Sequence, residues 1–300
     1  MLFRSDIIVI GGANVDIKAK TEKPHIAATS NPGSVSFTPG GVARNIAHNL
    51  ALLGTKVALI SVVGRDAPGE LAFAATTKAG VDLSFTMRSD VPTGSYIAVL
   101  DSNGELVTAV NDMRILENLD SEFVKRHAAA LEETKFIVAD CNIRQDLLEW
   151  LALHFGEKLI VEPVSVPKSA KLRTLLEKHE VFLATPNRDQ LAVLMEGGTD
   201  LHECGLHNLV VHMGSLGAVV SSQRGTMQIP SMRHAQVSDV TGAGDAAVAG
   251  LVYGLCKGYN IVEAARLGQA AASLKLGSTS STAAGLTETA LLEIMKRIHE

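Results

Sequence analysis

A glycine turn with an acid at each end is the part of this chain best suited to chemistry. It spans residues 239–245, with the sequence DVTGAGD, and small apolar residues follow it. Such a turn at a helix start offers free backbone N–H groups and the positive end of the helix dipole. We therefore predict that the amides of Gly242, Ala243 and Gly244 bind phosphoryl oxygens. An acid would repel phosphate there, so we predict that Asp245 accepts a proton from an attacking hydroxyl; the alternative is an acid that only compensates the dipole.

A second glycine segment has the sequence PGGVARN at residues 39–45 and precedes a helix expected over 45–53. Gly40 and Gly41 allow a ligand to approach the backbone closely, because neither carries a side chain. The Asn45 amide both donates and accepts hydrogen bonds. Those properties suit the hydroxyl groups of a sugar.

Taken together, these two segments resemble the signatures of the ribokinase or PfkB family of carbohydrate and nucleoside kinases. An Asn-x-Asp pair, Asn14 and Asp16, follows the opening strand and extends the resemblance over essentially the whole chain. The resemblance implies an ATP-dependent phosphotransferase with an alcohol acceptor. It also implies that Asp16, Asn45, Gly40 and Gly41 hold the ribose hydroxyls, while Asn14 sets the turn that carries Asp16. The alternative for Asp16 is a cap of a turn or helix.

Three further stretches resemble pseudouridine kinases within that family: NPGSVSFT at 31–38, VNDM at 110–113 and VADCNI at 138–143. This resemblance implies phosphorylation of the 5′-hydroxyl of pseudouridine. The main alternative is another sugar or nucleoside kinase of the family, acting on ribose, uridine, cytidine or adenosine. The implied contacts to the substrate come from four more positions: Thr38, Asn111, Asp112 and Asn142.

The resemblance places ATP on the other side of the anion turn. Gly214 and Gly217 permit the tight turn that contacts nucleotide phosphates and ribose in relatives. Gln269 lies in an alanine-rich helix, where small residues between helices are the alternative explanation. The complete set of implied ATP contacts is Asn187, His212, Gly214, Gly217 and Gln269.

Two kinds of cation are implied. The family usually has glutamate where this chain has Gln190, and an amide binds magnesium-linked water less strongly than a carboxylate does. We therefore expect Asp189 or Glu162 to compensate in binding Mg²⁺, or an altered metal dependence. Asp239 and the carbonyl of Thr241 resemble monovalent-cation ligands of many relatives, so activation by K⁺ is a hypothesis.

Two other classes of function compete with the kinase. Residues 242–247 fit the G-x-G-x-x-A spacing of dinucleotide-binding oxidoreductases, but no apolar strand leads into them and no acid follows about twenty residues on. A nucleoside-binding regulator without transfer activity is the other alternative. The intact turn with Asp245 argues against it, whereas Gln190 leaves it open.

Composition limits the partners. The chain has 300 residues, 46% of them hydrophobic, with a net charge of −5 and a pI near 6.1, which argues against a surface for nucleic acid polymers. Its three cysteines lie far apart and indicate no disulfide framework. The apolar run over 246–256 is too short to cross a membrane. We therefore expect a cytoplasmic protein with a small-molecule substrate.

The order of the expected elements predicts an α/β, ribokinase-like fold in one domain, residues 1–300, with a mostly parallel sheet flanked by helices. Segments 15–38 and 93–112 do not fit the alternation, and in the family such segments form a small β-sheet lid over the sugar. The lid either closes over its own site or packs against a second subunit in a homodimer. The expected strands are 7–10, 57–62, 136–139, 159–161, 181–183, 209–212 and 218–221, and the expected helices are 45–53, 68–79, 121–131, one from about 188, 243–256, 261–276 and 286–298.

Overall fold

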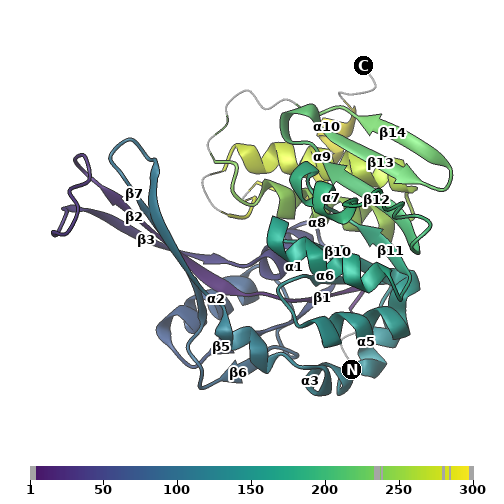
Figure 1. Cartoon of the computed structure of the whole chain (residues 1–300), viewed down its shortest axis with the longest axis horizontal. Helices are drawn as coiled ribbons and strands as arrows, with labels where there is room; N and C mark the ends of the chain where they lie inside the picture. Colours follow the sequence, from purple (N-terminus) through teal and green to yellow (C-terminus); the bar gives the residue numbers. More distant parts are fainter. Residues whose placement is uncertain (1–4, 233–236, 238, 279–280, 284, 297–300) are drawn as a thin grey trace.

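The computed structural model describes residues 5–232, 237, 239–278, 281–283 and 285–296. Its centre is an eight-stranded sheet in the order β14-β13-β12-β11-β10-β9-β1-β4 (Figure 1). The strands from β4 to β12 run parallel, and β13 and β14 are antiparallel. The bounds are β1 (Ile7–Ile10), β4 (Val57–Ile60), β9 (Phe136–Asp140), β10 (Leu159–Glu162), β11 (Val181–Ala184), β12 (Leu206–His212), β13 (Ala218–Ser222) and β14 (Gly225–Ile229).

Helices pack on both faces of this sheet. Ile7 and Val9 of β1 belong to one buried cluster with residues of α1, α8 and α9, whereas Ile8 and Ile10 join a second cluster with α5 and α6. Because neighbouring strand residues point to opposite faces, a strand covered on both sides is apolar throughout. The predicted mostly parallel sheet between helices is therefore confirmed. The helices are α1 (Val42–Leu52), α2 (Ala67–Lys78), α3 (Ser121–Lys125), α4 (Ala128–Glu133), α5 (Gln145–Phe155), α6 (Val166–Leu176), α7 (Arg188–Leu194), α8 (Ala243–Cys256), α9 (Ile261–Leu276) and α10 (Glu288–Lys296).

Two expected elements are each divided in the structure. The helix expected over 121–131 is interrupted, because Arg126 and His127 donate to carbonyls three residues back, which tightens the backbone and separates α3 from α4. The strand expected over 57–62 ends at Ile60, and β5 (Val62–Gly64) pairs with β6 (Met87–Ser89) instead. Residues 297 and 298 of the last expected helix lie outside the described residues. Across the helices that the structure describes, none has the length and apolar character needed to span a bilayer.

A separate four-stranded sheet projects from the body (Figure 1). We call it the small sheet; it consists of β3 (Gly33–Gly40), β2 (Asn14–Thr21), β7 (Gly94–Leu100) and β8 (Leu106–Asp112), in that order. Strand register aligns polar residues across one face and apolar residues across the other. The polar row is Thr38, Asp16, Tyr96 and Asn111, and the apolar row is Phe37, Ile17, Ile97 and Val110.

Candidate active site

Asp140, at the end of β9, connects the loops that form the site through hydrogen bonds. Its buried carboxylate accepts hydrogen bonds from the backbone amides of Gly12 and Ala43, each at 3.0 Å. These bonds connect the loop after β1 to the first turn of α1. A Cβ at Gly11 would lie 2.3 Å from the Asp140 carboxyl carbon, so only glycine leaves room for this arrangement. The Asn142 side chain also donates to Asp140, at 3.0 Å, and accepts from Lys168; it braces these loops.

The start of β2 places a second carboxylate beside the glycine pair. The Asn14 amide donates to Asp16 Oδ1 at 2.8 Å, and a Cβ at Gly40 would lie 2.4 Å from Asp16 Oδ2. Gly41 has φ +98° and packs against the carbonyl of Gly12. Glycine at both positions is thus required by the close approach of neighbouring atoms.

The first turn of α8 carries Asp245 to the same place. Asn45 Nδ2, on α1, donates to Asp245 Oδ2 at 2.8 Å. The other end of that amide, Oδ1, accepts from the Arg44 guanidinium at 3.0 Å, so the amide is oriented with its donor toward Asp245. Arg44 is itself buried and donates to the Pro39 carbonyl. The two glycine segments of the sequence therefore meet directly.

The surroundings of Asp245 bring its pKa close to neutral pH. Burial raises its pKa to about 7, the Asn45 hydrogen bond opposes the rise, and the nearby carboxylates of Asp140 and Asp16 add to it. Burial likewise raises the pKa of Asp16. A carboxylate with a pKa near the working pH is well matched to accepting a proton.

The amides of the anion turn are not all equally available. Gly242 has φ +80°, and the Ala243 amide donates back to the Val240 carbonyl at 3.1 Å, while the Ala246 amide starts the helical hydrogen bonds by donating to Gly242. A Cβ at Gly244 would meet nothing within 4 Å. Of the predicted phosphate donors, Gly244 thus borders open space, whereas the amide of Ala243 is used inside the turn.

A cavity of about 660 Å³ opens on the other side of the turn, against Ala243, Gly244 and Ala247. It is bordered by the end of β12 and by α9, and it brings together most of the expected ATP contacts: His212, Gly214, Gly217 and Gln269. Burial lowers the pKa of His212 to about 4, so its ring is neutral, and its Nε2 has no partner among the described residues.

Asn187 is absent from the cavity wall because its side chain caps α7. Asn187 Oδ1 accepts from the Gln190 amide at 2.9 Å, and Gln190 Oε1 accepts from the Asn187 amide at 2.7 Å. This reciprocal pair is a capping box, in which glutamine serves as well as glutamate. The departure from the family at Gln190 therefore has a structural role at the helix start.

Glu162 is one of the two acids expected to compensate for Gln190 in binding Mg²⁺. It is held by the Thr185 hydroxyl at 2.6 Å and the Val164 amide at 3.1 Å. Burial, with repulsion from Asp245 and Asp140, raises its pKa to about 8, so a cation beside it would favour its ionised form. Asp189 lies at the surface next to Arg188. No cluster of three metal-ligating side chains occurs in the described ranges.

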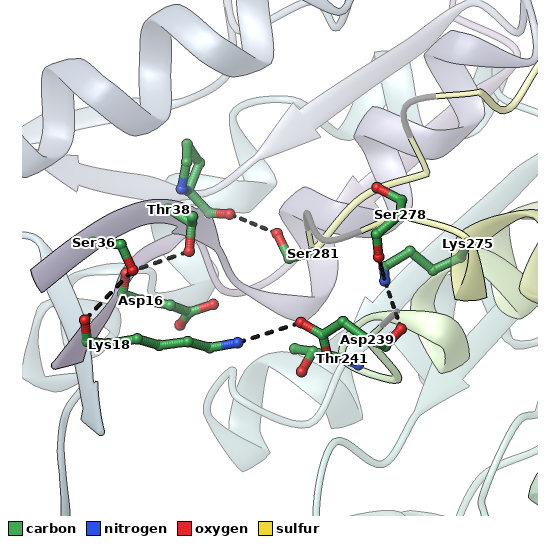
Figure 2. A network of polar contacts seen from close by, with 10 residues as sticks. Asp16, Lys18, Ser36, Thr38, Asp239, Thr241, Lys275, Ser278 and Ser281 are labelled. Carbon is green, nitrogen blue, oxygen red and sulfur yellow. Dashed lines mark hydrogen bonds and ion pairs between the residues drawn. The ribbon is translucent and has the colours of Figure 1, made fainter. Parts of the chain in front are cut away.

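Asp239, one of the two expected potassium ligands, already contacts two ammonium groups (Figure 2). Asp239 Oδ2 lies 3.4 Å from Lys18 Nζ, and the Asp239 carbonyl accepts from Lys275 Nζ at 3.0 Å. Asp239 Oδ1 accepts from the Thr241 amide at 2.8 Å. A further cation in the same place would be repelled by both ammonium groups. The residues present therefore do not fit a bound K⁺.

The small sheet brings two of its expected substrate contacts, Thr38 and Asn111, into one row with Asp16, but it does not bring Asp112 there. Thr38 and Asn111 share the polar row with Asp16, and Tyr96 joins them there. Asp112 follows Asn111 directly, so strand alternation turns it to the opposite face. Its carboxylate is bound by Arg114 at 2.7 Å. Asp112 is thus not brought to the cluster around Asp16.

Three charged residues that sequence reasoning left without a role prove to be buried: Arg44, Asp140 and Lys275. Each was visible as an isolated charge within or at the end of an apolar segment. A charge in such a place needs partners once the segment is buried. That pattern was the available signal, although it does not name the partners.

The chain is similar to known kinases in sequence and in structure. The model of the pfkB family of carbohydrate kinases matches residues 4–289. Pseudouridine kinase of Escherichia coli K12 is 36% identical over 285 residues, covering 90% of each chain. Guanosine-inosine kinase of Exiguobacterium acetylicum is 27% identical over 292 residues, covering 92% of this chain and 95% of the other. Ribokinase of Thermotoga maritima, 20% identical, shares the fold with a TM-score of 0.86 over 97% of this chain and 99% of its own.

The match to the family covers nearly the whole chain and includes both glycine segments. Kinases of this family use ATP with Mg²⁺ and transfer its terminal phosphoryl group to an alcohol. The oxidoreductase interpretation of residues 242–247 is therefore wrong, because the carbohydrate kinase model matches this segment with the rest of the chain. This chain belongs to the pfkB family of carbohydrate kinases.

Proposed function

We propose that this kinase phosphorylates the 5′-hydroxyl of pseudouridine, with Asp245 as the general base. The observation that carries the proposal is the position of Asp245. It lies beside Asn45 and near Asp16, on the opposite side of the α8 turn from the cavity lined by Ala243 and Gly244. An acceptor hydroxyl and a phosphoryl donor would thus approach the same helix start from two sides.

The chain's own groups account for the transfer. Asp245 takes the proton from the attacking hydroxyl, and the Gly244 amide and the α8 dipole stabilise charge on the transferred group. Asp16 and Asn45 hold ribose hydroxyls, and the small sheet acts as a lid that excludes water. Bound Mg²⁺, held by the phosphates and Glu162, would neutralise phosphate charge.

The choice of pseudouridine rests on the similarity to a pseudouridine kinase at 36% identity. Pseudouridine has a carbon–carbon glycosidic bond, which leaves an extra ring N–H that uridine lacks. The polar row of the small sheet, with Thr38, Tyr96 and Asn111, offers acceptors for it. A site that pairs this N–H discriminates against uridine, because a buried acceptor would lose its partner.

Another nucleoside or sugar kinase is the second candidate, favoured by the similarity to a purine nucleoside kinase at 27% identity over a comparable span. A regulator without transfer activity has less support. Gln190, the departure that kept it open, caps α7, and Asp245 retains its setting.

The test measures ADP release from ATP and Mg²⁺ with pseudouridine, uridine, cytidine, adenosine and ribose in parallel. Pseudouridine should give the highest kcat/KM, and Asp245→Asn should abolish that turnover. Preference for another acceptor would reject the substrate while keeping the mechanism. An absence of turnover with every acceptor would favour the regulator.

We also propose that a second copy of this chain covers the apolar face of the small sheet. Phe37 and Val110 on that face are 56% and 60% exposed. The other face of the sheet carries the polar row that is proposed to contact the substrate. The apolar row is therefore suited to packing against the same row of a second subunit in a symmetric dimer.

A further inference from the structure

Lys275 is a cation buried at the end of α9. Its side chain has no exposed surface, and its Nζ donates to the carbonyls of Asp239 and Ser278, each at 3.0 Å. Figure 2 shows the ammonium between these two loops, one leading into α8 and one following α9. No other large charged side chain among the described residues is buried so completely.

The surroundings are those that a buried cation needs. An unpaired ammonium away from water is strongly disfavoured, whereas carbonyl oxygens and the negative end of a helix stabilise it. Burial lowers the pKa of Lys275, and the Asp239 carboxylate opposes that change. The two carbonyl oxygens that accept from Lys275 and the nearby Asp239 carboxylate favour the charged form of its side chain.

The two loops that Lys275 joins also hold the catalytic turn. The Ser281 carbonyl would lie 2.0 Å from a Cβ at Gly242, so the loop after α9 packs directly on the start of α8. Ser281 Oγ donates to the Pro39 carbonyl at 2.9 Å, which ties the same loop to the glycine pair (Figure 2). Moving either loop would therefore move Gly242, and with it the first turn that carries Asp245.

We propose that the Lys275 ammonium is a built-in monovalent cation, a positioning group that makes the enzyme independent of potassium. Potassium and an ammonium group carry the same charge, have similar size and both bind carbonyl oxygens. The position next to Asp239, where the family resemblance suggested K⁺, is thus served by the chain itself. Lys18, on the small sheet, adds a second ammonium at the Asp239 carboxylate.

The test compares Lys275→Ala with Lys275→Met in the chloride salts of choline, sodium, potassium and ammonium at equal ionic strength. Alanine leaves space for an ion, whereas methionine fills the space without a charge. Both variants should lose at least about tenfold in kcat in choline, and potassium or ammonium should restore Lys275→Ala to within about threefold of the parent while leaving Lys275→Met unrestored. The melting temperature of Lys275→Ala should rise with the same ions.

Lys158→Met is the matched control. Lys158 Nζ also donates to two carbonyls, those of Glu132 and Thr134, but it precedes β10 at the opposite end from Glu162. Its loss should change stability without creating a dependence of kcat on the cation.

Two outcomes would overturn the inference. One is activation of the parent enzyme by potassium over choline by more than about fivefold, because an independent ion site would then exist. The other is a Lys275→Ala variant whose activity and melting temperature respond to no ion. The inference rests on the proposed kinase function for its kcat arm only. If the parent transferred phosphate to no acceptor, the melting temperatures would still test the role of Lys275. If neither variant folded, the response of the parent enzyme to potassium would test it.

Discussion

Asn45 Nδ2 and Asp245 Oδ2 lie 2.8 Å apart although 200 positions separate the residues in the chain. This bond joins the first turns of α1 and α8, each preceded by a glycine that cannot carry a side chain. It couples the group expected to bind sugar to the group expected to remove its proton. The pKa of Asp245 depends on it, since Asn45 favours the ionised carboxylate.

Asp245→Asn should lower kcat by about 10²–10⁴-fold while leaving the fold and the KM for ATP nearly unchanged. The amide keeps the shape of the side chain and cannot accept the hydroxyl proton. Steady-state kinetics with a melting curve would check this result. Asp189→Asn, at an exposed acid, should retain full activity, and near-normal turnover of Asp245→Asn would remove the general base from the mechanism.

Asn45→Ala should move the acidic limb of the pH profile of kcat/KM to higher pH. The substitution removes the hydrogen bond that holds the Asp245 pKa down, so more of the enzyme carries a protonated, inactive base at neutral pH. Asn49→Ala is the control on the same helix, because Asn49 accepts from the Ala283 amide and not from the site. Identical profiles for both variants would contradict the coupling.

The stability of the free protein should respond to the buried acids in the opposite sense to a salt bridge. The pKa of Asp245 rises from 3.8 to about 7 and that of Glu162 from 4.5 to about 8 on folding. Between those values the folded state binds more protons than the unfolded state, so these groups favour folding at low pH and lose that contribution as pH rises. The difference in melting temperature between Asp245→Asn and the parent should therefore be more favourable to the variant at pH 8 than at pH 5. An unchanged difference would show that Asp245 titrates normally.

Two glycines of the turn should respond differently to alanine. Gly242→Ala places a Cβ 2.0 Å from the Ser281 carbonyl at φ +80°, and it should destabilise the protein by about 1–3 kcal/mol or more. Gly244→Ala meets nothing within 4 Å and should stabilise the fold by about 0.4–1 kcal/mol. The same methyl group should raise the KM for ATP if phosphate approaches Gly244. A normal KM would place the phosphate elsewhere.

Phe37→Asn should dissociate the proposed homodimer, since it places a polar group within the apolar row of the small sheet. Analytical ultracentrifugation of the parent and the variant measures the change. Ser36→Asn, on the other face of the same strand, should leave the dimer intact. A monomeric parent enzyme would show that the small sheet closes over its own site alone.

Much of the fold followed from local patterns. The strand at 7–10 and the helices near 243–256 and 261–276 matched β1, α8 and α9, because buried strands are apolar throughout and glycine or asparagine marks helix starts. The division of 121–131 into α3 and α4 was not predicted. Its cause is that the backbone amides of Arg126 and His127 donate to carbonyls three residues back. The spacing of apolar side chains does not reveal such a change in backbone hydrogen bonding.

The sequence by itself determined the family and the acids and amides available for catalysis, because a glycine required by close packing and an acid beside an anion turn are properties of short segments. Only the tertiary structure decided their use. It turned Asp112 away from Asp16, committed Gln190 to capping α7, and set the ammonium of Lys275 against the Asp239 carbonyl. The physical reason is that hydrogen bonds and charges act over a few ångströms, and folding alone determines which distant residues come that close.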